Sequence, residues 1–260
     1  MGMLHFDYLS QILGYHTNIY FILPSCTHEG KAPAATLYLL HGGGGNGMDW
    51  MRYSSIERYA DKHNIAVVMP EVDGSCFYAD MKFGYDYFTY LTKEVVAVAE
   101  GLLPVNKEPE KRLVAGLSMG GYGAFKWAFC HPESFFAAAN LSGISFIMDI
   151  FGGNGFAAKD AEAKCGPVAL NWGSLAELEG SDSDSKEWID RAVKENRTLP
   201  HLFAAIGTED YSYQLAVDYL KYCKEQGIDV HYEEMAGGHE WIVWDTMIDR
   251  FMGWALEKMA

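Results

Sequence analysis

Positive charge is scarce in this chain. Its 260 residues include 20 lysines and arginines against 35 aspartates and glutamates, which gives a formal net charge of −15 at pH 7. Binding to the phosphates of nucleic acid or to an anionic membrane surface requires clustered basic side chains, so neither is an expected partner. A neutral or cationic small molecule is easier to accommodate.

Cysteine pairs and metal-binding motifs are also missing. The five cysteines are scattered, and no two form a Cys-x-x-Cys pair, which fits reduced thiols in a cytoplasmic protein. No His-Glu-x-x-His motif or Cys/His cluster is present, so no metal is predicted. The first residues lack a basic segment followed by an apolar one, and no apolar run is long enough to span a bilayer.

What the chain does contain is an alternation of strand-like and helix-like segments. Residues 6–13 and 15–23 flank Gly14 and predict an antiparallel hairpin at the edge of a sheet. Further strands are predicted at 35–40, 65–70, 113–117, 135–141, 201–206 and 229–233, and helices at 48–63, 87–102, 122–129, 216–223 and 241–258. This alternation predicts a mostly parallel sheet with helices on both faces, in one domain over residues 1–260.

Residues 143–199 are less regular than the rest. They include Gly152-Gly153-Asn154-Gly155 and the polar run Ser181-Asp182-Ser183-Asp184-Ser185. One interpretation is an excursion above the sheet that caps a site, and the other is an ordinary surface insertion. The sequence scarcely separates the two.

The strand at 113–117 ends in Gly116-Leu117-Ser118-Met119-Gly120, and a helix-like segment follows at once. This Gly-x-Ser-x-Gly pattern is typical of a sharp strand-to-helix turn that lifts a serine hydroxyl above the edge of a sheet. The two glycines leave room for neighbouring backbone, and the helix N-terminus favours negative charge on a reacting oxygen. A turn or helix-capping serine is the alternative, but the flanking strand and helix favour a nucleophile.

A serine nucleophile needs a base and a third group that orients the base. With this kind of serine, the acid and the histidine follow in that order, each beyond the C-terminal end of a strand. Glu209 and Asp210 follow the strand at 201–206, and His239 follows the last strand among glycines. We prefer Asp210 to Glu209 because it lies further along the turn. A helix cap for Asp210 and a solvated loop position for His239 are the alternatives.

Attack on an acyl carbonyl creates an oxyanion that fixed donors must stabilise. One donor should be the backbone N–H of Met119, and the other should come from the glycine-rich loop after His41. We predict Gly43 as that second donor, with Gly42 and Gly44 as alternatives. The loop matches neither of the glycine patterns that bind phosphate.

Together these motifs resemble the esterase D / tributyrin esterase branch of the α/β-hydrolases. The matching features span nearly the whole chain: Phe21-Ile22-Leu23-Pro24, Leu39-Leu40-His41-Gly42 with Asn46 and Trp50, Phe77-Tyr78-Ala79-Asp80-Met81, the segment from Gly116 to Ala124, Gly207-Thr208-Glu209-Asp210 and Gly238-His239-Glu240-Trp241. The resemblance implies an α/β-hydrolase fold, carboxylesterase activity on short acyl esters, no cofactor and frequent homo-oligomers. It assigns the nucleophile to Ser118, the acid to Asp210 and the base to His239. The four glycines after His41 depart from the pattern, since relatives often carry a bulkier residue there.

The sequence therefore predicts a serine carboxylesterase that acts on a small-molecule ester through an acyl-enzyme. Residues near the strand ends are predicted to wall the substrate pocket, with core packing as the alternative for each aromatic: His41, Trp50, Phe77, Tyr78, Trp172 and Trp241. Alternatives among hydrolases are an S-formylglutathione-type thioesterase and a feruloyl or acetyl-sugar esterase. An alternative of another class is a non-catalytic binding module, which has no need of an intact serine, acid and histidine.

Overall fold

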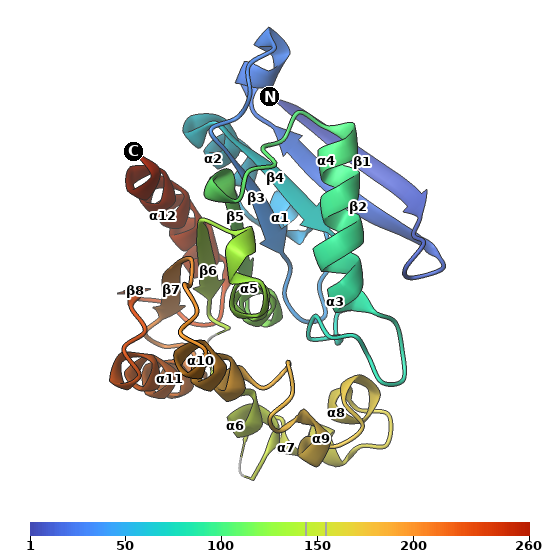
Figure 1. The fold of residues 1–260 in the computed structure, drawn as a ribbon, viewed down its shortest axis with the longest axis vertical. Coiled ribbons are helices and arrows are strands. Elements are labelled where there is room, and N and C mark those ends of the chain that lie inside the picture. Colours follow the sequence, from blue (N-terminus) through green and yellow to red (C-terminus); the bar gives the residue numbers. More distant parts are fainter. Residues whose placement is uncertain (144, 154) are drawn as a thin grey trace.

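The centre of the molecule is one eight-stranded sheet (Figure 1). The computed structural model describes residues 1–143, 145–153 and 155–260. The strands lie in the order β1-β2-β4-β3-β5-β6-β7-β8; neighbours from β4 to β8 are parallel, whereas β1, β2 and β4 pair antiparallel. Their bounds are β1 (Gly2–Leu9), β2 (His16–Leu23), β3 (Ala35–Leu40), β4 (Ile65–Pro70), β5 (Arg112–Leu117), β6 (Ala137–Leu141), β7 (His201–Gly207) and β8 (Val230–Met235). The predicted mostly parallel sheet with an N-terminal hairpin at its edge is confirmed.

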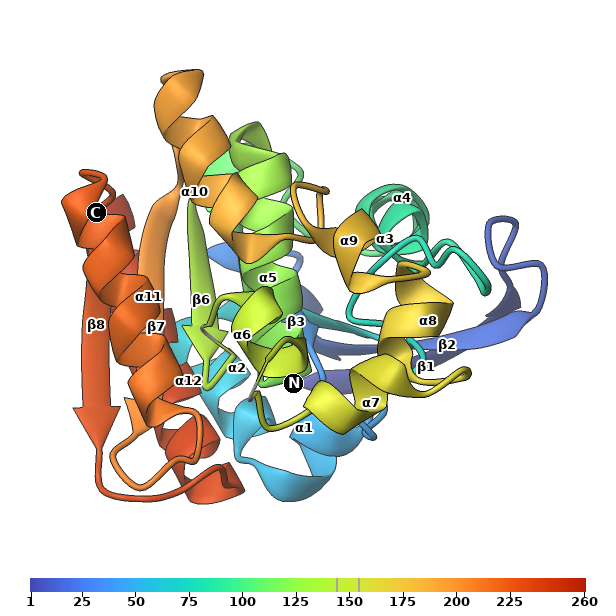
Figure 2. The ribbon, with the colours of Figure 1, turned by 90° about the horizontal axis from the view of Figure 1, so that it is seen from below.

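Helices cover both faces of this sheet (Figures 1 and 2). One face packs against α1 (Asp49–Tyr53), α2 (Ile56–His63) and α12 (Trp241–Met259). The other packs against α3 (Tyr87–Thr89), the π-helical η2 (Tyr90–Val95), α4 (Val96–Leu102), α5 (Met119–Cys130), α10 (Ser185–Lys194) and α11 (Tyr213–Glu225). Short 3-10 turns are η1 (Ser25–Glu29), η3 (Pro109–Lys111) and η4 (Pro132–Ser134). No helix in the described ranges is both long and apolar enough for a membrane crossing.

The central strands are buried on both sides because side chains alternate across a strand. In β3, Leu37 and Leu39 contribute to the core under α12, whereas Tyr38 and Leu40 contribute to the core under α5. Each fully buried leucine contributes roughly 1.5–3 kcal/mol through the apolar surface it removes from water. The continuous apolar run of β3 thus follows from its place in the middle of the sheet.

The first strand begins earlier than the predicted 6–13. β1 ends at Leu9, and the residues after it form a turn that a distant carboxylate holds. Glu94 accepts hydrogen bonds from Ser10 Oγ at 2.8 Å and from the next two backbone N–H groups at 2.9 and 3.0 Å. Leu13 is buried in the core, so its apolar character reflects burial within a turn and not a strand.

The connections of the sheet place a crevice beyond the carboxyl ends of its strands. β3 lies between β4 and β5, so the chain order reverses there, and such a reversal is where α/β sheets carry their sites. Four short helices gather beyond one end of the sheet (Figure 1): α6 (Ile147–Phe151), α7 (Ala158–Glu162), α8 (Pro167–Asn171) and α9 (Leu175–Leu178). They belong to the excursion predicted at 143–199, of which Ile144 and Asn154 lie outside the described residues. That this excursion acts as a cap stays a prediction.

Candidate active site

Ser118 lies at the junction of β5 and α5 in a strained conformation, with φ 51° and ψ −120°. The neighbouring glycines make this turn sterically feasible. A Cβ on Gly116 would collide with the backbone of Gly120, and one on Gly120 would lie 2.5 Å from the carbonyl oxygen of Leu40. The Ser118 N–H donates to the carbonyl of Leu141 at 2.7 Å, which ties the turn to the next strand.

The side chains of Ser118, His239 and Asp210 form one hydrogen-bonded row. Nε2 of His239 lies 2.9 Å from Oγ of Ser118, and its Nδ1 lies 2.8 Å from Oδ2 of Asp210. The alternative acid, Glu209, is exposed, and its Oε2 instead accepts the backbone N–H of Gly237 at 2.6 Å. Of the two adjacent carboxylates, the structure therefore places Asp210 against the histidine.

Asp210 is held from both sides. Its Oδ1 accepts hydrogen bonds from the backbone N–H of Ser212 at 2.9 Å and from its hydroxyl at 2.7 Å. Burial by itself would raise the pKa of Asp210, but the hydrogen bonds from His239 and Ser212 outweigh it and hold that pKa below its ordinary value. A charged Asp210 fixes the imidazole proton on Nδ1, which leaves Nε2 of His239 as the acceptor for the Ser118 hydroxyl proton.

The two predicted oxyanion donors, Met119 and Gly43, line the same cavity as Ser118. Met119 is the first residue of α5, so its N–H has no carbonyl in a preceding helical turn to bind. Gly43 lines this cavity with Met119, and a Cβ built on it would lie 3.9 Å from the Met119 Cβ. The N–H of Gly44 already donates to the carbonyl of Gly74 at 2.8 Å, which removes it from the candidates.

His41 was predicted to wall the substrate pocket, but it does not line the cavity. It instead holds two loops together. Its ring is buried, its Nε2 accepts the backbone N–H of Val72 at 3.2 Å, and its Nδ1 donates to the carbonyl of Gly42 at 2.9 Å. Burial lowers the pKa of His41 and favours the neutral ring. The other alternative donor, Gly42, packs against the side chain of Leu117.

Two of the predicted pocket tryptophans also belong to the packed interior. Trp50 is fully buried, and its Nε1 donates to the carbonyl oxygen of Leu40 at 3.0 Å. Trp241 packs edge-on against it, with ring centroids 5.3 Å apart. Their positions near the strand ends reflect core packing, since large aromatic rings gain most from burial.

Tyr78 and Trp172 lie behind the cavity wall. Tyr78 is fully buried and donates its hydroxyl to the carbonyl of His41 at 2.9 Å. Trp172 is buried against the ring of Phe77 at 5.7 Å between centroids. Of the predicted aromatic walls, Phe77 is the one that lines the cavity.

The cavity beside Ser118 has a volume of about 200 Å³. Its inner wall is apolar and largely buried, whereas its mouth carries two exposed rings, Phe156 and Tyr211, and the exposed Asp160. The apolar and aromatic side chains of the inner wall are Phe77, Met119, Tyr122, Ile150, Phe151, Ala157 and Pro167, and Ser142, Ser145 and Ser212 also line the cavity. Among the described residues that line it, none is lysine or arginine.

Sequence reasoning missed the rings at the mouth. Tyr211 packs against His239 with ring centroids 4.7 Å apart, and Phe156 meets Tyr211 edge-on at 5.2 Å. The position of Tyr211 directly after Asp210, in a loop beyond a strand, was an available signal. Phe156 lies in the irregular excursion, where no periodicity assigns an aromatic to a wall.

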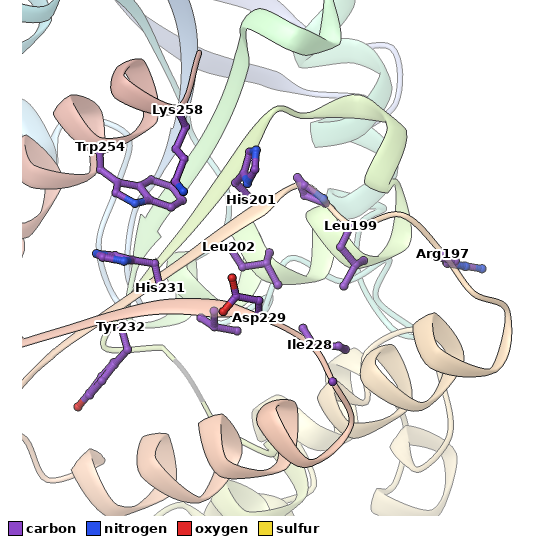
Figure 3. Close-up of a pocket in the computed structure, with 13 residues that line it drawn as sticks. Arg197, Leu199, His201, Leu202, Ile228, Asp229, His231, Tyr232, Trp254 and Lys258 are labelled. Carbon is purple, nitrogen blue, oxygen red and sulfur yellow. The ribbon is translucent and has the colours of Figure 1, made fainter. Parts of the chain in front are cut away.

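A second hollow of about 540 Å³ lies at the other end of the strands (Figure 3). Its walls include His201 at the start of β7, His231 in β8, and Trp254 and Lys258 of α12. The seven residues of β7 span about 20 Å at roughly 3.3 Å per residue, and Asp210 lies beyond them. These histidines are therefore remote from Ser118. Within the described ranges, no three His, Cys, Asp or Glu side chains are grouped as a metal site requires.

The fold and the enzyme class are those of a serine hydrolase with an α/β-hydrolase fold. A family model described as "Putative esterase" matches residues 10–254, and the chain belongs to this esterase family. An acetyl esterase of Caldicellulosiruptor saccharolyticus is 32% identical over 98% of both chains. Two structures from Staphylococcus aureus each cover 98% of both chains. The substrate-bound fluorophosphonate-binding serine hydrolase F is 31% identical with a TM-score of 0.88, and an S-formylglutathione hydrolase apoenzyme is 32% identical with a TM-score of 0.83.

Proposed function

We propose that this chain is a carboxylesterase that cleaves short-chain acyl esters through an acyl-enzyme, as in the esterase D / tributyrin esterase branch. The observation that carries the proposal is the hydrogen-bonded row of Ser118, His239 and Asp210 beside a small apolar cavity. The similarity to an acetyl esterase supports a short acyl group.

In the first half of the reaction, Ser118 Oγ attacks the ester carbonyl while Nε2 of His239 takes its proton. Asp210 accepts the Nδ1–H bond and stabilises the imidazolium that forms. The imidazolium then gives its proton to the alcohol oxygen as the C–O bond breaks. The products of this half are the free alcohol and an acyl group bound to Ser118.

The negative charge on the carbonyl oxygen is proposed to be stabilised by the N–H groups of Met119 and Gly43. Both residues line the cavity that holds the serine hydroxyl, and the dipole of α5 adds to the effect. In the second half, His239 removes a proton from water, which attacks the acyl carbonyl. Ser118 leaves with that proton, and the carboxylic acid is released.

The test is hydrolysis of p-nitrophenyl acetate together with labelling by a fluorophosphonate probe. The native chain should label stoichiometrically, and Ser118→Ala should neither label nor turn over, with kcat reduced by roughly 10⁴-fold or more. Ser142→Ala is the matched control and should still label. This buried serine also lines the cavity, but it makes no hydrogen bond in the row of Ser118, His239 and Asp210. A native chain that does not label would instead support the non-catalytic binding module.

A thioesterase of the S-formylglutathione hydrolase type is the second candidate, since the structure from Staphylococcus aureus that is 32% identical to this chain carries that name. Rates on an acetyl ester and on S-acetylglutathione, which share one acyl group, distinguish the two. A cytoplasmic location and homo-oligomers stay predictions.

A further inference from the structure

We propose that Trp244 is a positioning residue that keeps the imidazole of His239 in place after Ser118 has been acylated. Its effect falls on the second half of the reaction, the hydrolysis of the acyl-enzyme, more than on the first. This inference rests on the proposed esterase function and adds a residue outside the row of Ser118, His239 and Asp210.

Trp244 lies near the start of α12, five residues after His239. Its side chain is buried, and its ring meets the ring of His239 almost at a right angle, with centroids 5.0 Å apart and an interplanar angle of 86°. Trp244 is not one of the described residues that line the cavity beside Ser118. Any effect of Trp244 on the reaction must therefore act through His239.

Other large rings hold Trp244 in its place. Trp241 packs edge-on against it at 5.3 Å between centroids, and the fully buried Trp50 packs edge-on against Trp241 at the same distance. Close packing of this kind leaves a buried ring little room to move. Tyr211 also packs against His239 but is 63% exposed, so fewer neighbours restrict it. Trp244 is thus the more rigid of the two rings that contact the histidine.

Acylation removes one of the two hydrogen bonds that hold the imidazole. In the free enzyme, Nδ1 of His239 lies 2.8 Å from Oδ2 of Asp210, and Nε2 lies 2.9 Å from Oγ of Ser118. In the acyl-enzyme, Oγ of Ser118 is an ester oxygen and has no proton to donate. The bond to Asp210 then remains, and a single hydrogen bond does not stop the ring from tilting about it. The contact with Trp244 is the rigid restraint that acylation leaves unchanged.

The position of the imidazole decides the rate of this second half. Water attacks the acyl carbonyl while Nε2 of His239 takes one of its protons, and a new C–O bond forms. The bond between the acyl carbon and Oγ of Ser118 then breaks, and Oγ takes the proton from Nε2. Since a misplacement of about 1 Å can slow such a step by roughly 10²-fold, a tilted ring should delay hydrolysis.

The experiment is stopped-flow hydrolysis of p-nitrophenyl acetate. The burst of p-nitrophenol gives the acylation rate, and the steady state that follows gives the deacylation rate. Trp244→Leu should slow deacylation by roughly tenfold or more and acylation by less than about threefold, so that a stoichiometric burst is seen and KM falls. Trp244→Met should behave in the same way, because its flexible side chain fills space without a rigid ring.

Two further variants separate positioning from stability. Trp244→Phe keeps a ring beside His239 and removes an indole N–H that is buried without a partner among the described residues, so both rates should stay within about threefold of native. Trp127→Leu is the matched control: Trp127 is equally buried but packs against Tyr38 and Phe135. It should lose stability without a change in the ratio of the two rates. Thermal unfolding shows that each variant is folded at the assay temperature.

The possible failures can be told apart. If the folded Trp244→Leu and Trp244→Met slow both steps equally, or if Trp127→Leu produces the same burst, the positioning role is wrong and the esterase stands. Loss of folding in both Trp244 variants would show that this ring serves stability, and it would also overturn the proposal. If the native chain releases no p-nitrophenol and does not label with a fluorophosphonate, the proposed function itself fails.

Discussion

Nζ of Lys126 lies 3.0 Å from the carbonyl oxygen of Tyr78, in the buried core beneath the site. Its second hydrogen bond goes to Oγ of Ser183 at 2.9 Å, and the ring of Phe88 lies 4.5 Å away. Tyr78 and the preceding Phe77 both have positive φ, at 47° and 46°, a conformation that needs such support. Since Phe77 lines the cavity, Lys126 fastens the segment that carries one wall of the site to the excursion.

Removing this ammonium group should loosen that wall. Lys126→Met keeps most of the side-chain volume but leaves two buried acceptors without their donor, which should lower the free energy of unfolding by about 1–3 kcal/mol. KM for p-nitrophenyl acetate should rise by roughly threefold to tenfold with a smaller change in kcat, because the reacting groups stay in place. Lys82→Met, which removes an exposed ion pair with Glu177, should change the unfolding free energy by less than about 1 kcal/mol. Equal effects of the two substitutions would contradict the role of Lys126.

The adjacent carboxylates should differ sharply in their effect on rate. Asp210→Asn should lower kcat by about 10³- to 10⁴-fold, because the amide no longer fixes the imidazole proton on Nδ1 of His239. Glu209→Gln preserves an acceptor for the N–H of Gly237 and should stay within about threefold of the native rate. Steady-state hydrolysis of p-nitrophenyl acetate measures both, and similar losses for the two variants would refute the assignment.

Acyl length should be limited by Phe151, a buried residue of the inner wall that packs against Phe77 at 5.3 Å. On p-nitrophenyl esters of rising chain length, kcat/KM should be highest between acetyl and butyryl and fall by octanoyl. Phe151→Ala should move the optimum to longer chains by opening the wall, at a cost of roughly 3–5 kcal/mol in stability. Phe151→Leu is the milder variant, and thermal unfolding shows which of the two is folded at the assay temperature. An unchanged length profile in a folded variant would exclude this wall as the limit.

Stability should fall on mild acidification because of His41. Its pKa is lower in the folded chain than the unfolded value of about 6.5, so above that pH the ring is neutral in both states and contributes no pH dependence. As pH falls below about 6.5, the unfolded chain gains a proton that the folded chain resists, which lowers stability by up to about 1.4 kcal/mol per pH unit. Urea unfolding at pH 7.5 and 5.5 should show a smaller difference for His41→Gln than for the native chain. The exposed His28→Gln should retain the native difference, and a His41→Gln difference as large as the native one would refute the prediction.

The sequence contains enough information to predict the sheet well and its edge less well. β3 and β4 begin and end where predicted, because six consecutive buried residues leave a continuous apolar run. β1 differs because an edge strand has no such run: its pairing of Gly2 with Leu23 is set by β2, and its end is set by Glu94. Neither influence is visible in the local pattern of residues 6–13.

The candidate site could likewise be predicted only in part. Ser118, Asp210 and His239 could be named in advance because each stands just beyond a strand in an order that the chemistry requires. The cavity walls could not, because an aromatic side chain near a strand end fits the core and the site equally well. Trp50 is buried in the core, whereas Phe156, which lies in a segment without periodicity, is exposed at the mouth of the cavity.

Both proposed oxyanion donors, at positions 43 and 119, are peptide N–H groups and not side chains. Divergence can therefore replace the residue at position 119 without discarding the group that stabilises charge. Several residues that line the cavity lie in a separate stretch of chain, the excursion of 143–199. Substitutions in that excursion can therefore change which esters fit the cavity, while Ser118, Asp210 and His239, which lie outside it, are retained.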